Sequence, residues 1–174
     1  MTECPDHPWT RLERWLESRH ALVLSLLVIA AAAPRIAGMF TEFWIDEIWS
    51  LLIVAEAHSW SDLLFGQNHD NNHRLNSVLM AMAGVDQPWP VYRISTVGFG
   101  VATVWLISRD SVPGREIESL TAGVLTASSF LMVLYATEAR GYAGLMCFSL
   151  VAYLAIGRHK ASGSDKSALV ANLA

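Results

Sequence analysis

Carboxylates, histidines and arginines gather in three short polar segments of an otherwise strongly apolar chain. The first is the pair Asp46 and Glu47, the second covers residues 69–74, and the third covers residues 135–142. Carboxylates can act as bases, histidine with aspartate can bind a metal, and guanidinium groups bind phosphate through paired hydrogen bonds. Together the three segments predict a site for a phosphate-bearing lipid at a membrane interface.

The adjacent carboxylates Asp46 and Glu47 allow two interpretations. Beside low-dielectric lipid a carboxylate becomes easier to protonate, and it can then serve as a base toward an acceptor hydroxyl. Acids are also favoured at the start of a helix, where they cap it or oppose its dipole. Both interpretations stay open from the spacing alone.

The second segment contains His69, Asp70 and His73. Two histidines four residues apart with an aspartate between them are typical metal ligands. The alternative is a solvated polar turn, with an asparagine capping a helix that begins near Leu75. The sequence contains no second pair of ligands that would favour the metal.

The third segment holds Glu138 and Arg140, and Arg93 is expected at the same height in the membrane because it lies near the start of its own apolar block. Charged residues at membrane depth are costly, and they are kept where they pair or bind something. Two interpretations follow: a phosphate ligand bound by the arginines, or a Glu138–Arg140 or Glu138–Arg93 ion pair that only locks helices together.

Composition places this polar chemistry in a membrane protein. Of 174 residues, 53% are hydrophobic and only 16% are charged, whereas a soluble domain has about 25% charged residues. The net charge of −4 and the lack of a basic run argue against nucleic acid as a partner. Cys4 and Cys147 lie too far apart in sequence to indicate a disulfide framework or a metal pair.

Four apolar blocks cover residues 21–40, 91–108, 119–135 and 141–157. Each is close to the about 20 residues that cross the hydrocarbon core as a helix. We therefore predict an all-α integral membrane protein with about four transmembrane helices. The first block could instead be a cleavable signal peptide, but its polar lead-in with three glutamates and Pro34 at the cleavage position argue against that.

Basic residues orient the four blocks. They precede the first block, separate the second from the third and follow the fourth: Arg11, Arg14, Arg19, Arg109, Arg115, Arg158, Lys160 and Lys166. The positive-inside rule makes these regions cytoplasmic. We expect a cytoplasmic segment at 1–20, a transmembrane module at 21–160, and a linker with the start of a further span at 161–174. The protein then crosses the cytoplasmic membrane several times, and both of its termini lie on the cytoplasmic side.

The outer loop, residues 41–90, is too long for a plain connector. It carries Trp44, Trp49, Trp60 and Trp89, and such residues settle at membrane interfaces. Helical spacing over 45–58 and an apolar run over 75–85 predict two juxtamembrane helices on the outer leaflet, joined by the polar segment 67–74.

Across residues 21–158 the chain resembles the bacterial family 39-type membrane glycosyltransferases, relatives of protein O-mannosyltransferases and of the rhizobial lipopolysaccharide and aminoarabinose transferases. No single motif is specific, but four follow in order: Trp44-Ile-Asp46-Glu47, Asn72-His73-Arg74-Leu75-Asn76, Tyr92-Arg93-Ile94-Ser95 and Tyr135-Ala-Thr-Glu138-Ala-Arg140-Gly-Tyr142. The resemblance implies the GT-C fold, with this chain as its N-terminal module.

The resemblance also implies an activity, the transfer of a sugar from a polyprenyl-phosphate carrier to a lipid, polysaccharide or protein acceptor at the outer membrane face. Asp46, with Glu47 beside it, corresponds to the catalytic carboxylate. Substrate and lipid-phosphate contacts are expected from His73, Arg93, Glu138, Arg140 and Tyr142. A proline usually follows the histidine in the family, and Arg74 stands there instead. The residues name no definite cofactor, and a divalent ion near Asp46 and His73 is compatible with them.

Family members are considerably longer than this chain, so we expect a module that is inactive alone or needs a partner. One alternative is a truncated or non-catalytic membrane subunit whose acids and arginines only pair. A transporter is the other, but the charges cluster at one face, and the sequence shows neither a pair of broken helices nor an inverted repeat.

Overall fold

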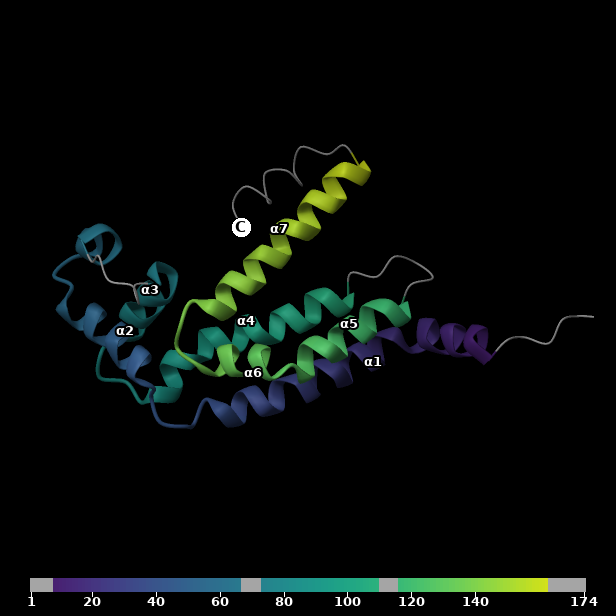
Figure 1. Cartoon of the computed structure of the whole chain (residues 1–174), viewed down its shortest axis with the longest axis horizontal. Helices are drawn as coiled ribbons and strands as arrows, with labels where there is room; N and C mark the ends of the chain where they lie inside the picture. The colour runs from purple at the N-terminus through teal and green to yellow at the C-terminus, as the bar shows by residue number, and fades with distance from the viewer. Residues whose placement is uncertain (1–7, 67–72, 110–115, 163–174) are drawn as a thin grey trace, which may run out of the picture.

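The structure, a computed structural model, describes residues 8–66, 73–109 and 116–162, and every regular element within these ranges is helical (Figure 1). The all-α prediction is confirmed for this part of the chain. The elements are α1 (Pro8–Gly38), α2 (Ile45–Glu56), the π-helical turn η1 (Asp62–Gly66), α3 (Arg74–Ala83), α4 (Trp89–Arg109), α5 (Glu116–Ser128), α6 (Phe130–Thr137) and α7 (Tyr142–Ser162).

Two helices are long and apolar enough to cross a membrane, α1 over Arg11–Gly38 and α4. α5 and α6 together meet the same criterion as a bent pair, which makes up to three candidate spans in the described ranges. α7 is not among these candidate spans, and near its end at Ser162 it carries the basic residues Arg158, His159 and Lys160. All four apolar blocks are therefore helical, and two or three of them have the properties of a span.

The third block is broken, contrary to the single straight helix expected over residues 119–135. α5 and α6 meet at Ser129 with a bend of 59°. The Thr126 and Ser128 hydroxyls each donate 2.8 Å hydrogen bonds to carbonyls four residues earlier, which bends a helix. Neighbouring serines at 128 and 129 also mark a usual place for a kink.

Several polar side chains lie inside the bundle beside apolar ones, while large apolar side chains are exposed on its outside. Arg35 and Arg93 are fully buried, whereas Leu26, Ile29 and Leu125 are 58%, 67% and 65% exposed. Water would penalise such an exposed apolar surface, but lipid would not. This distribution is consistent with a membrane protein.

α4 lies at the centre of the bundle, in contact with α1, α5, α6 and α7. Figure 1 shows α1, α4 and α5 running side by side, with α2 and α3 gathered at one end and α7 diverging from the others. The α6–α7 connection lies at the same end as α2 and α3, and this proximity positions the candidate site.

We call α2, η1 and α3 the helical cap. The two helices predicted between the first and second spans are confirmed at nearly the expected residues, and η1 is an additional turn. Residues 67–72 of the polar segment lie outside the described ranges. Ile53, Val54, Leu63 and Met80 of the cap form a small core together with Tyr92 of α4 and Ala139 of the α6–α7 connection.

Candidate functional site

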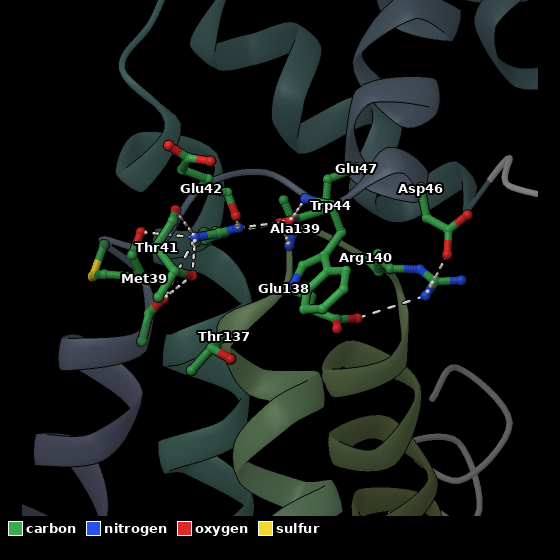
Figure 2. Close-up of polar contacts among 12 residues, drawn as sticks. Met39, Thr41, Glu42, Trp44, Asp46, Glu47, Thr137, Glu138, Ala139 and Arg140 are labelled. Atoms are coloured by element: carbon green, nitrogen blue, oxygen red, sulfur yellow. Dashed lines mark hydrogen bonds and ion pairs between the residues drawn. The ribbon is translucent and has the colours of Figure 1, made fainter.

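Glu47 is fully buried and its carboxylate is held by four donors. Arg93 Nε and Nη2 donate to Oε1 and Oε2 at 2.8 and 2.6 Å. The Trp44 amide at 2.9 Å and the Ala139 amide at 2.5 Å complete the set (Figure 2). An ionised carboxylate has about four acceptor positions, so this one is saturated. The arrangement does not support a catalytic role for Glu47 itself.

Arg93 is equally enclosed. Besides Glu47 it donates from Nη1 to the Thr41 and Met39 carbonyls at 2.6 and 3.1 Å, and from Nη2 to the Glu42 carbonyl at 2.9 Å. These bonds tie the end of α1 and the start of the cap to α4. The phosphate contact expected of Arg93 is not supported by this geometry, because its donors are taken and its side chain is 0% exposed. The Glu138–Arg93 alternative is replaced by the Glu47–Arg93 pair.

The Ala139 peptide is clamped between the two helices of the cap. Its N–H donates to Glu47 on α2, and its C=O accepts a 2.6 Å hydrogen bond from Asn76 Nδ2 on α3. Asn76 is 3% exposed. Asn76 was not expected from the sequence to have a role. A polar residue within an apolar helical run is nevertheless a signal of a buried hydrogen bond like this one. The clamp fixes the α6–α7 connection, which carries Glu138 and Arg140.

Arg140 is the centre of a more open cluster at this end of the bundle. Its Nη1 lies 3.0 Å from Asp46 Oδ2 and 3.6 Å from Glu138 Oε2 (Figure 2). Its Nη2 donates to the Tyr142 hydroxyl at 3.1 Å, and its guanidinium lies 4.7 Å from the centre of that ring. The Asp46 side chain is 40% exposed and that of Arg140 is 16% exposed. Unlike the buried Glu47–Arg93 pair, this cluster is accessible from outside.

A cavity of about 300 Å³ adjoins the cluster, and its lining combines polar and apolar side chains from α3 and α7: His73, Arg74, Leu75, Gly141, Tyr142, Leu145 and Phe148. His73 and Tyr142 meet edge to face with ring centroids 5.0 Å apart. Gly141 permits the close approach, since a Cβ there would lie 2.7 Å from the His73 Cβ. The structure therefore brings Asp46, His73, Arg140 and Tyr142 together and leaves Arg93 beneath them.

Three buried polar atoms of the cluster have no hydrogen-bond partner: His73 Nε2, Glu138 Oε2 and Arg140 Nε. For Glu138 Oε2 the 3.6 Å ionic contact with Arg140 remains. Buried polar atoms are usually satisfied. The unsatisfied atoms of His73, which lines the cavity, and of its neighbours Glu138 and Arg140 indicate a place where a polar ligand or water binds.

Burial also changes the proton affinity of two groups in the cluster. Burial raises the pKa of Glu138, an effect that the neighbouring Arg140 opposes. Burial lowers the pKa of His73, and Arg140 lowers it further while Asp46 raises it. Burial and the charge of Arg140 therefore both favour the neutral form of the imidazole.

The predicted metal site receives no test from this geometry. Within residues 8–66, 73–109 and 116–162, no three histidine, cysteine or acidic side chains are grouped so as to hold an ion. His69 and Asp70 lie outside these ranges. A divalent ion near Asp46 and His73 stays a prediction.

Comparisons with protein-family models, with curated proteins and with solved structures found no match for this chain. The class of the protein is defined by its fold and its site. In the described residues it is all-helical, with two or three candidate membrane spans and a charged, partly open cluster at one end of its bundle. The resemblance to glycosyltransferases rests on the four sequence motifs.

Proposed function

We propose that this chain is the N-terminal module of a GT-C membrane glycosyltransferase. It transfers a sugar from a polyprenyl-phosphate carrier to an acceptor at the outer face of the cytoplasmic membrane. The supporting observation is the Asp46–Arg140 pair at 3.0 Å, which puts an accessible carboxylate and a cation beside a cavity. These are the two groups that the transfer of a sugar from a phosphate requires.

The orientation follows from the charges. With the basic segments inside, α1, α4, the α5–α6 pair and α7 form four spans, and the helical cap and the α6–α7 connection lie outside. Large exposed side chains of the cap suit the interface between headgroups and lipid chains, among them Trp44, Trp60 and Phe65 at 61%, 57% and 81% exposed.

In the proposed reaction Asp46 is the base. The acceptor hydroxyl gives its proton to the Asp46 carboxylate as its oxygen bonds to the anomeric carbon. The bond between that carbon and the phosphate oxygen breaks, and its electron pair leaves with the lipid phosphate. Arg140 stabilises the charge that develops on the leaving phosphate.

Arg140 takes the phosphate role alone in this scheme, because Arg93 is engaged by Glu47. The unpaired Arg140 Nε supports this assignment, since a phosphate oxygen would satisfy it. Leu75, Leu145 and Phe148 line the cavity next to the cluster. They offer an apolar surface to the first part of a lipid chain.

The alternative is a non-catalytic membrane subunit, and one observation favours it. Every acid of the cluster is within reach of an arginine: Glu47 pairs with Arg93, and both Asp46 and Glu138 contact Arg140. Such pairs by themselves can lock helices without doing chemistry.

A transfer assay separates the two functions. The wild-type chain and Asp46→Asn are expressed in membranes, with Glu42→Gln as the matched control, since Glu42 is an exposed acid in the same loop. The assay measures how much labelled sugar is transferred from radiolabelled polyprenyl-phosphate sugars to each of a panel of acceptors. Loss of a general base lowers the rate by about 10²–10⁴-fold, so Asp46→Asn should lose transfer and Glu42→Gln should keep it. Because this chain is expected to be inactive alone or to need a partner, the same assay is run on its longest available reading frame. A well-expressed wild-type long form that is inactive with every donor would favour the non-catalytic subunit.

A further inference from the structure

Arg35 is a fully buried cation that the proposed chemistry does not use. It lies on α1, near the outer end of the first span, with 0% of its surface exposed. Within the described residues no acidic side chain forms an ion pair with Arg35. Its Nη donors go to backbone carbonyls instead, to Ala31 at 2.7 Å and to Thr126 and Ala127 at 3.4 Å each, whereas its buried Nε has no partner within the described residues. An unpaired arginine within a span is costly, so its position requires an explanation.

The two distant carbonyls belong to the break between α5 and α6. The backbone ladder of α5 ends with the Ser129 amide bonded to the Leu125 carbonyl, and it resumes with the Val133 amide bonded to the Ser129 carbonyl. The carbonyls of Thr126 and Ala127 fall in the gap, at the C-terminal and partly negative end of α5. In lipid such carbonyls need donors from elsewhere in the protein.

We infer that Arg35 is a positioning residue whose guanidinium replaces the amide donors lost at the break and thereby fixes the direction of α6. One planar group with several N–H donors can reach two neighbouring carbonyls at once, which a single ammonium group does less well. The positive charge also opposes the negative end of the α5 dipole.

The surroundings of Arg35 are shaped for this contact. Gly100 of α4 lies against Arg35 and against Ala136 of α6, and a Cβ at Gly100 would be 3.2 Å from Arg35 Nε and would overlap the Ala136 Cβ. α4 therefore leaves room for the guanidinium at the place where α6 packs. α6 leads directly into Glu138 and Arg140, so its direction decides where the site residues lie. The inference rests on the break and on Arg35, and it is independent of the proposed glycosyltransferase activity.

Distances between spin labels in the full-length protein, reconstituted in lipid nanodiscs, test the inference. Both cysteines are replaced, and labels are placed on lipid-exposed positions of α6 and α4, Leu131→Cys and Ile94→Cys. A second pair reports on the rest of the bundle, Leu26→Cys on α1 with Ile94→Cys. The three parent residues are 55%, 59% and 58% exposed.

Arg35→Met removes the donors, and Arg35→Lys keeps the charge with a single donor group. Arg19→Met is the matched control on the exposed part of α1. Arg35→Met should broaden and shift the α6–α4 distance distribution and leave the α1–α4 distribution unchanged, and Arg35→Lys should give an intermediate broadening. An unchanged α6–α4 distribution, or equal broadening of both pairs, would overturn the inference. Should Arg35→Met fail to fold, an Arg35→Lys protein with the wild-type α6–α4 distribution would overturn it as well.

Discussion

Glu47 and Arg93 form a buried, hydrogen-bonded ion pair that holds together α1, α2, α4 and the α6–α7 connection. Breaking such a pair on one side leaves a buried charge and costs about 3–5 kcal/mol. Arg93→Met and Glu47→Gln should each lower the unfolding midpoint of the purified protein strongly. The double variant should recover part of the loss, because no lone charge is then buried.

Asp46→Asn is the comparison for this effect, since it breaks the partly exposed pair with Arg140. Exposed pairs contribute about 0–1 kcal/mol, so its midpoint should stay close to wild type. Equal destabilisation by Asp46→Asn and Arg93→Met would contradict the division into a buried structural pair and an open cluster.

The raised pKa of Glu138 makes a prediction about pH. Its ordinary value is 4.5 and burial raises it in the folded state, so the folded protein binds more protons than the unfolded chain above pH 4.5. Stability is therefore lost as pH rises from 4.5 through the folded-state pKa. Glu138→Gln cannot ionise and should lose less stability over the same interval. Unfolding midpoints measured between pH 4 and 8 check this, and parallel curves for the two proteins would show that Glu138 does not contribute.

At the scale of elements, Gly141 controls how closely the α6–α7 connection approaches the start of α3. In Gly141→Ala the added methyl group would meet the His73 ring. Overfilling a packed contact costs about 1–3 kcal/mol. Gly157→Ala on α7 is the control, because nothing lies within 4 Å of its added methyl group. Thermal unfolding should show a loss for Gly141→Ala only, and equal midpoints would mean that the close contact is relaxed in solution.

The helices themselves follow from sequence patterns, because apolar blocks and helical spacing are local properties. The break at Ser129 cannot be predicted from such local patterns. Serines and threonines within an apolar block are common in membrane helices, and only the packing of Arg35 against the freed carbonyls distinguishes this one. The pairing of each acid with its arginine could not be predicted from the sequence either. Sequence placed Asp46, Glu47, Arg93 and Arg140 in one group, but it could not show which arginine pairs with which acid.

At the scale of the whole molecule, the cluster depends on segments far apart in the sequence. Asp46 comes from α2, His73 from the position just before α3, Arg140 from the α6–α7 connection and Tyr142 from the first position of α7. The topology predicted from the apolar blocks and basic residues placed these segments at one face of the membrane. It did not predict the two levels, a saturated buried pair below and an open cluster above, because burial depends on how the cap packs on the spans.

The most direct test of the proposed site is the binding of polyprenyl phosphate, without sugar, to the full-length protein in nanodiscs. If Arg140 holds the phosphate and Asp46 competes for Arg140, two variants must change the affinity in opposite directions. Arg140→Ala should weaken binding at least about tenfold, or about 1.4 kcal/mol, Asp46→Asn should tighten it, and Glu42→Gln should leave it unchanged. Wild-type affinity in Arg140→Ala, or weaker binding in Asp46→Asn, would contradict the assignment of this cluster as the phosphate site.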